Sequence, residues 1–284
     1  MTTSLKGTLD SFIENFRYEN HLQRDPVRFV YRYSNDQDRE IAALFAAAFA
    51  YGNVTQILNT LEWLFGLMGE SPYNYVLRFS SSDFAGLRRF YHRFNTGRDV
   101  AALCLALQRA LLEFGSLQNL FLLGHDPPAR TIEGGLPIFV ENLLHRVPPA
   151  VYRRKSLPAD AGVRFLLSSP ESGSACKRMN LFLRWMVRPA PVDFRIWNRV
   201  EPRQLVLPVD THIARIGRYI GLTRRNNIGW KMALEMTEAL RLLDADDPIR
   251  YDFALCHLGI MRGCPAKYNP LKCRICPIRE ICTL

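Results

Sequence analysis

Apolar side chains recur at helical spacing along most of this 284-residue chain. Near the start, Leu5, Leu9, Phe12 and Phe16 fall on one stripe of a helix expected over residues 5–18. Strand-like alternation is not evident in any segment, so the pattern predicts an all-α protein. Further helices are expected from a cap at Asp36 or Asp38 through Phe49 and over residues 55–68, 99–114, 117–122, 132–145, 212–219, 230–243 and 248–258.

Capping residues mark the ends of several of these segments. Gly69 and Gly115 directly follow apolar runs, where glycine commonly closes a helix. Asp247 followed by Pro248 is typical of a cap with proline at the first helical position. These signals predict where helices begin and end.

Composition and charge narrow the possible partners. A hydrophobic content of 48% is sufficient for a sizeable core, and a net charge of +10 favours a polyanion, nucleic acid before membrane. No apolar run is as long as a membrane span, and the start of the chain lacks a signal-peptide pattern. We therefore expect a cytoplasmic protein, nucleoid-associated if bacterial.

Four of the seven cysteines lie close together at the end of the chain, at Cys264, Cys273, Cys276 and Cys282. In a reducing compartment such a group favours a metal site over disulfides. Zinc ribbons usually contain two Cys-x-x-Cys pairs, and here there is one such pair. We therefore expect a 4Fe–4S cluster, with zinc as the alternative.

A lysine and an aspartate carry the candidate chemistry. Lys177 falls in the first turn of an expected helix, where the helix dipole disfavours an ammonium ion and makes the amine a better nucleophile. Asp210 follows Pro208 at the start of another helix, a favourable place for a carboxylate. Together they would suit chemistry at a sugar anomeric carbon. Alternatively, Lys177 is one of 37 basic side chains and binds phosphate.

These motifs resemble the helix-hairpin-helix DNA glycosylases (HhH-GPD superfamily) of the endonuclease III type. Lys177, Asn180 and the sequence Val209-Asp210-Thr211-His212 match that family's lysine, asparagine and aspartate motifs. The family's hairpin corresponds to the tract Glu171-Ser172-Gly173-Ser174-Ala175, which keeps the first of two glycines. The last two cysteine gaps, of two and five residues, also match the family's cluster loop.

The resemblance implies two helical domains that flank a DNA-binding cleft. The first is a helical barrel over residues 38–200, with a hairpin-like element near 171–187. The second joins residues 1–37 to residues 201–284 and carries the cluster loop at 264–282. Residues 83–162 have no counterpart in the family.

The resemblance also implies a DNA base-excision repair enzyme that flips a damaged base out of double-stranded DNA. Lys177 would form a Schiff base that permits AP lyase activity, and Asp210 would stabilise positive charge on the sugar. The alternatives are a monofunctional glycosylase that uses Asp210 to activate water, and a non-catalytic iron–sulfur DNA-binding protein. We expect a monomer.

Several residues are expected to contact DNA. Tyr51 and Asn53 lie in a turn corresponding to the loop that wedges a side chain into the duplex, although an ordinary turn explains each of them as well. Further candidates are Gly173 and Ser174 in the hairpin tract and Arg178 just after it. Arg224 and Arg225 lie in a basic loop, which could bind phosphate or could simply be a solvated loop.

The long insert between the two motifs, residues 188–207, suggests which damaged base the protein removes. Its aromatics Phe194 and Trp197, with Trp185 before them, are expected to line a pocket for an oxidised purine. Oxidised pyrimidines and deaminated bases remain open alternatives.

Overall fold

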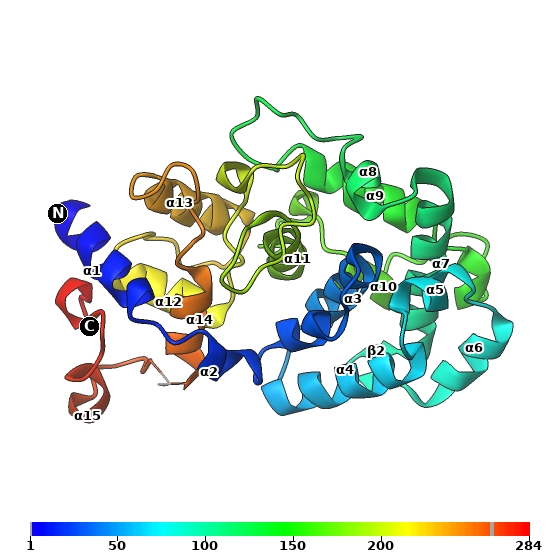
Figure 1. The fold of residues 1–284 in the computed structure, drawn as a ribbon, viewed down its shortest axis with the longest axis horizontal. Helices are drawn as coiled ribbons and strands as arrows, with labels where there is room; N and C mark the ends of the chain where they lie inside the picture. Colours follow the sequence, from blue (N-terminus) through cyan, green and yellow to red (C-terminus); the bar gives the residue numbers. More distant parts are fainter. Residues whose placement is uncertain (1, 262–263) are drawn as a thin grey trace.

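A computed structural model of the chain, which describes residues 2–261 and 264–284, confirms the all-α prediction (Figure 1). The strands of the described residues form a hairpin of two residues each, with Tyr91 opposite Thr96 and His92 opposite Asn95. No helix among the described residues is long and apolar enough to span a membrane. The first part of the chain contains α1 (Thr2–Glu14), α2 (Glu19–Leu22), η1 (Pro26–Arg32), α3 (Asp36–Ala48), α4 (Val54–Met68), α5 (Pro72–Leu77), α6 (Ser81–Gly86), η2 (Leu87–Arg89), β1 (Tyr91–His92), β2 (Asn95–Thr96), α7 (Gly97–Phe114) and α8 (Leu117–Phe121).

The second part of the chain contains the helices that build the candidate site. They are α9 (Gly135–His145), η3 (Pro149–Tyr152), α10 (Gly162–Leu166), η4 (Pro170–Ser172), α11 (Lys177–Val187), η5 (Pro202–Gln204), α12 (Thr211–Tyr219), α13 (Trp230–Arg241), α14 (Asp252–Met261), α15 (Pro270–Cys273) and η6 (Arg279–Ile281).

Several predicted helix ends agree with the structure. Gly69 and Gly115 follow α4 and α7 with φ angles of +65° and +76°, which a residue with a side chain rarely adopts. The predicted cap of α3 is wrong: Asn35 caps that helix, with its Oδ1 accepting the Asp38 amide at 2.8 Å. Asp38 instead accepts from Ser71 Oγ and the Tyr73 amide, and so ties α3 to α5.

The helix expected from Pro248 begins only at Asp252. Residues 248–251 form turns instead, in which the Arg250 amide donates to the Asp247 carbonyl at 3.1 Å and the Asp252 amide donates to the Ile249 carbonyl at 3.0 Å. Just before them, Asp244 Oδ1 accepts the backbone amides of Asp246 and Asp247 at 3.1 and 2.9 Å. As a result, Asp252 lies in the first turn of α14 and faces α11.

Helix α3 lies at the centre of the core and packs against both α11 and η1. Its residues from Ile41 to Ala48 are fully buried. The buried Glu40 on the same helix accepts the Leu117 and Gln118 amides at 2.9 and 3.1 Å and the Trp197 indole N–H at 2.6 Å. One carboxylate therefore joins α3, the start of α8 and the insert after α11.

Helix α11 lies between two groups of helices in Figure 1. Helices α3 to α10 lie on one side of it, while α1, α12, α13, α14 and α15 lie on the other, together with both chain ends. On that side α12 packs against α14, and α1 packs against η6. The domain boundaries expected from the sequence stay a prediction.

Candidate active site around Lys177 and Asp210

Lys177 is the first residue of α11 and follows a strained turn. Cys176 before it adopts a left-handed conformation, with φ of +49°, and its amide donates to Ser174 Oγ at 3.1 Å. The Lys177 ammonium donates to the backbone carbonyl of Ala50 at 3.0 Å. The start of α11 is thereby joined to the end of α3, a connection across 127 positions of sequence.

Asp210 is the N-cap of α12, as its place in the sequence predicts. Its Oδ1 accepts the amides of His212 and Ile213 at 2.8 and 2.9 Å, which fixes the carboxylate at the helix start. Its Oδ2 lies 3.9 Å from Lys177 Nζ, and the two side chains are 20% and 29% exposed. The structure therefore brings the two candidate residues together, and solvent can reach both.

A cavity of about 990 Å³ surrounds this pair. It lies between the turn after α3, helix α11, the start of α12 and one face of α14. Its volume is within the range usual for small-molecule sites. The polar side chains that line it are Arg24, Asp25, Arg28, Tyr51, Thr55, Asn59, Lys177, Arg184, Asp210, Thr211, His212, Asp252, Cys256 and His257.

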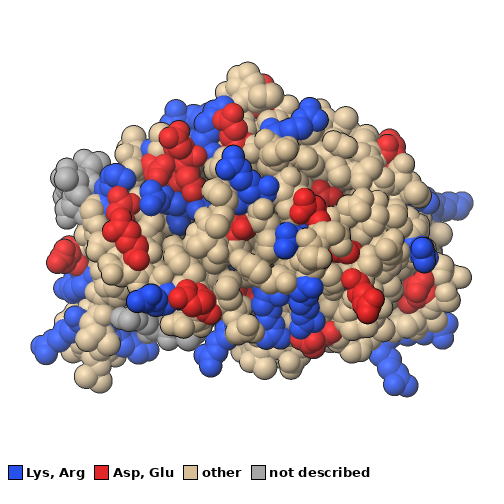
Figure 2. Space-filling model, in the orientation of Figure 1, with Lys and Arg blue, Asp and Glu red and all other residues tan. Residues whose placement is uncertain are grey.

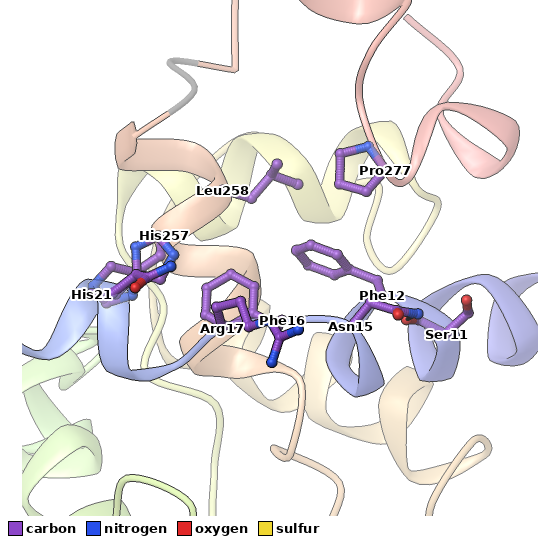
Figure 3. Close-up of a pocket in the computed structure, with 10 residues that line it drawn as sticks. Ser11, Phe12, Asn15, Phe16, Arg17, His21, His257, Leu258 and Pro277 are labelled. Atoms are coloured by element: carbon purple, nitrogen blue, oxygen red, sulfur yellow. Dashed lines mark hydrogen bonds between the residues drawn. The ribbon is translucent and has the colours of Figure 1, made fainter.

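A second cavity of about 400 Å³ lies among α1, α2, α14 and Pro277 (Figure 3). Neither a lysine nor a carboxylate is among its lining residues. His257 lines both cavities, with Nδ1 3.0 Å from the Phe253 carbonyl and Nε2 3.5 Å from Asp25. The larger cavity is thus the one that combines an amine with a carboxylate.

Cys256 is a third member of the site that the sequence does not single out. Its Sγ lies 4.0 Å from Asp210 Oδ2 and lines the larger cavity. Burial, and then the negative charge of Asp210, raises the pKa of this thiol well above its ordinary value. The neutral thiol is therefore a hydrogen-bond donor toward the carboxylate. The sequence contains no signal for this contact, because it depends on how α14 packs against α12.

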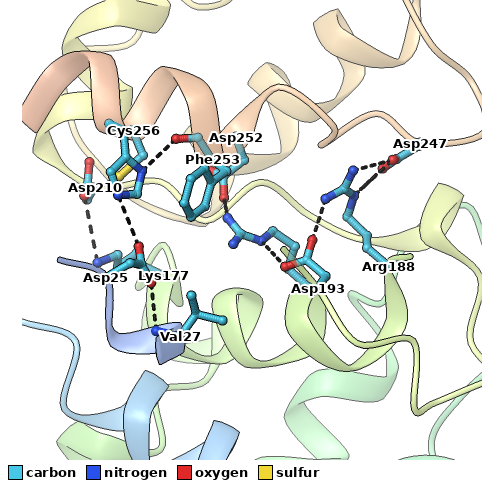
Figure 4. A network of polar contacts seen from close by, with 12 residues as sticks. Asp25, Val27, Lys177, Arg188, Asp193, Asp210, Asp247, Asp252, Phe253 and Cys256 are labelled. Carbon is cyan, nitrogen blue, oxygen red and sulfur yellow. Dashed lines mark hydrogen bonds and ion pairs between the residues drawn. The ribbon is translucent and has the colours of Figure 1, made fainter. Parts of the chain in front are cut away.

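The other end of α11 carries a buried network of ion pairs (Figure 4). Asp193 accepts from Arg184 Nε at 3.2 Å and from Arg188, and Arg188 also pairs with Asp247 at 2.7 Å. Arg184 Nη1 donates to Asp252 on α14. The pKa of Asp252 is raised to about 6, mainly by burial. The charge of Arg184 opposes this rise, and the charge of Asp210 adds to it. Arg184 and Asp252 also line the larger cavity.

Tyr51 lines the cavity but is held by its neighbours. Its hydroxyl donates to Asn95 Oδ1 at 2.5 Å and lies 3.1 Å from the His92 carbonyl. Its ring packs edge-on against Phe165, with 4.9 Å between centroids. Asn53 is exposed and caps α4 by accepting the Thr55 amide at 2.9 Å. In this structure Tyr51 is a fixed wall of the cavity and Asn53 is a cap.

Arg178, expected at the DNA surface, is instead buried. Its guanidinium lies 3.7 Å from the Phe165 ring centroid and donates to the Phe165 carbonyl. Burial lowers its pKa to about 10. Helix α11 therefore turns Arg178 away from the cavity and into the aromatic cluster around Tyr51, and the DNA contact expected of it stays a prediction.

The other expected DNA contacts lie at the surface but apart from the cavity lining. Gly173 has a φ of +74° and accepts the Trp230 amide at 3.2 Å, which joins the hairpin tract to α13. Arg224 is exposed, and Arg225 pairs with Glu235 at 2.5 Å. Basic and acidic side chains alternate on the face shown in Figure 2. That face is therefore not a uniform basic surface.

The three aromatics expected in the pocket do not line it. Trp185 and Trp197 are fully buried, and Trp197 packs among core rings such as Phe121 and Phe182. Phe194 packs against Tyr31, with 4.7 Å between ring centroids. The amides of Phe194 and Trp197 donate to carbonyls near the end of α11, so the insert folds back onto that helix rather than over the cavity.

The four terminal cysteines lie away from the cavity lining. Burial raises the pKa of Cys264, and the nearby Cys276 and Cys282 raise it further, while Arg215 lowers it. Cys273 is buried, and its sulfur accepts the Asn269 amide at 3.4 Å. Among the described residues, no three His, Cys, Asp or Glu side chains are close enough to hold one metal ion. The cluster therefore stays a prediction from the spacing.

Comparison with known proteins identifies a family. The family described as "Protein of unknown function (DUF2400)" matches residues 25–261, which is most of the chain and includes every residue of the cavity lining except Arg24. No curated protein and no solved structure matches the chain.

Proposed function

The chain belongs to the family described as "Protein of unknown function (DUF2400)", and we propose that this protein is a DNA glycosylase with AP lyase activity. The observation that carries the proposal is the 3.9 Å approach of Lys177 Nζ to Asp210 Oδ2 inside a solvent-reachable cavity. A nucleophilic amine next to a fixed carboxylate is the arrangement that attack at a deoxyribose carbon requires. The net charge of +10 supports a polyanionic partner.

In the proposed reaction, the neutral amine of Lys177 attacks C1′ of the flipped nucleotide. The N-glycosidic bond breaks, its electron pair leaves with the base, and Asp210 takes the proton that the amine releases. The negative charge of Asp210 also stabilises the developing positive charge on the sugar. Opening of the sugar ring gives a Schiff base, and loss of a C2′ proton then expels the 3′ phosphate.

One contact favours a second candidate, a monofunctional glycosylase. Lys177 donates to the Ala50 carbonyl at 3.0 Å, and this hydrogen bond occupies the group that would have to attack. If Lys177 stays there, Asp210 would activate water and Lys177 would bind phosphate. The cavity and the carboxylate are common to both candidates.

Borohydride trapping on abasic-site and lesion-bearing duplexes tests the proposal. A covalent adduct that is lost in Lys177→Ala and kept in Lys231→Ala, an exposed lysine of α13, is the expected result. Base release that persists in Lys177→Ala but fails in Asp210→Asn would select the monofunctional enzyme. Salt-dependent duplex binding without turnover of any substrate would contradict both and point to a non-catalytic DNA-binding protein.

The iron–sulfur cluster remains a proposal based on the four thiols, and no step of the reaction passes through it. Cys264, Cys273, Cys276 and Cys282 would hold it, and it would serve as a structural staple for the end of the chain. Iron and acid-labile sulfide in protein purified without oxygen would support the cluster. Zinc alone would support the alternative.

A further inference from the structure

The larger cavity has an outer end and an inner end along α11. Lys177, Leu181 and Arg184 all line it, and their spacing of four and three residues places them on one face of the helix. Two turns of helix separate Lys177 from Arg184, roughly 10 Å along the axis. Lys177 is 29% exposed and Arg184 only 3%, so the amine lies near the mouth and the guanidinium lies deep.

Arg184 has one nitrogen at this inner end that no described residue pairs with. Its Nε pairs with Asp193 and its Nη1 with Asp252, but its Nη2 is buried and has no hydrogen-bond partner within residues 2–261 and 264–284. A buried guanidinium rarely leaves a donor unsatisfied, because the lost hydration is not replaced. Asp252, the carboxylate next to it, also lines the cavity and is 3% exposed. A donor and an acceptor thus lie side by side.

Resting on the proposed function, we infer that Arg184 and Asp252 read the edge of the flipped base and select bases that carry a carbonyl next to a ring N–H. The carbonyl would accept from Arg184 Nη2, and the ring N–H would donate to Asp252. Guanine-type, hypoxanthine-type and uracil-type bases present this lactam edge. Adenine-type and cytosine-type bases present an amino group and an unprotonated ring nitrogen, which would place donor against donor and acceptor against acceptor.

The position of the pair relative to the reacting centre supports this assignment. With the sugar at Lys177 and Asp210 near the mouth, the base extends inward along α11 toward Arg184. Arg188 belongs to the same buried network, also pairs with Asp193, and does not line the cavity. It therefore provides a matched control for effects that arise from the network alone.

The test compares two pairs of bases that differ in this edge, 5-hydroxyuracil against 5-hydroxycytosine and hypoxanthine against adenine, each placed in a duplex. We expect the wild-type protein to release the lactam-edged member of at least one pair and to discriminate against its amino-edged partner by about tenfold or more. Arg184→Lys keeps the positive charge but removes the forked donor. It should lower kcat/KM for that base by about tenfold or more while abasic-site trapping changes by less than about twofold.

Arg188→Lys should leave both readouts within about twofold of the wild type, because it does not face the base. Equal release of amino-edged and lactam-edged bases would overturn the inference and leave the proposed function standing. Loss of trapping together with base release in Arg184→Lys would overturn it as well, since abasic DNA has no base to read. Absence of both trapping and base release in the wild type would overturn the proposed function, and this inference with it.

Discussion

The two ends of α11 each place a basic side chain against an aspartate, but in different settings. At the start of the helix, Lys177 and Asp210 are 3.9 Å apart and partly exposed. Near its end, Arg188 lies 2.5 Å from Asp193, and these two side chains are 6% and 0% exposed. The first pair is loose and reachable by a substrate, whereas the second is tight and closed.

This difference separates reactive from structural charges. A buried ion pair must satisfy both partners, because each has lost its hydration. A partly exposed pair keeps some of its water and can exchange its partner for a substrate. The same residue types therefore serve different purposes, and burial rather than charge distinguishes them.

Removing a carboxylate from the buried ion-pair network near the end of α11 should have the largest effect on stability. Asp193→Ala leaves Arg184 and Arg188 with fewer partners in a dry environment, and we expect it to lower the unfolding free energy by about 3–5 kcal/mol. Urea unfolding followed by circular dichroism measures this loss. Asp36→Ala, which removes a carboxylate that is 69% exposed, is the control and should cost less than about 1 kcal/mol. Similar costs for both variants would contradict the distinction.

Asp210 tests whether one carboxylate both caps a helix and supports the reaction. Asp210→Ala should lower the unfolding free energy by about 1 kcal/mol, because the amides of His212 and Ile213 lose their acceptor. Asp210→Asn keeps a capping oxygen, so its unfolding free energy should be close to that of the wild type. Its base release should stay as low as that of Asp210→Ala, because the negative charge is lost. Denaturant unfolding and a lesion-release assay on the same samples separate the two roles. Recovery of base release in the asparagine variant would exclude a role for the negative charge.

Lys177 should matter little for stability. Because it is partly exposed and 3.9 Å from its carboxylate, Lys177→Ala is expected to change the unfolding free energy by less than about 1 kcal/mol. Urea unfolding midpoints compared with those of Lys231→Ala measure the difference. A loss as large as that of Asp193→Ala would mean that Lys177 is a structural ion rather than a poised nucleophile.

A buried histidine that pairs with uncharged groups extends the comparison, with a smaller expected effect. His92 lies 3.0 Å from the Tyr51 carbonyl and 2.8 Å from Thr60 Oγ1. Burial lowers its pKa, and the nearby Arg93 lowers it further, while the Tyr51 carbonyl raises it. The stability that neutral His92 provides should therefore be present above the ordinary histidine pKa of about 6.5 and be lost as pH falls through its lower folded value.

Thermal unfolding between neutral and mildly acidic pH measures this dependence. We expect His92→Gln to flatten the decline in midpoint toward acid, whereas His145→Gln, at a histidine whose side chain is 73% exposed, leaves it unchanged. An unchanged slope in His92→Gln would show that protonation of His92 does not limit stability in acid.

The sequence by itself determined the helical class and many of the helix ends. Apolar spacing and local capping depend on neighbours within a few positions, so Gly69, Gly115 and Asp210 could be interpreted without the fold. Lys177 and Asp210 were also identified from their local motifs and the resemblance they carry. The roles proposed for them, and the cluster expected from the four terminal cysteines, stay predictions.

Only the tertiary structure decided which side chains meet. The packing of α14 against α12 and α11 brings Cys256 to Asp210 and Asp252 to Arg184, contacts that span 46 and 68 positions of sequence. Other tertiary contacts turned Arg178 into the aromatic cluster around Phe165 and placed Trp185 and Trp197 in the core, against expectation. The physical reason is that periodicity shows that a helix has a buried face, whereas the partner of that face depends on how distant helices pack together.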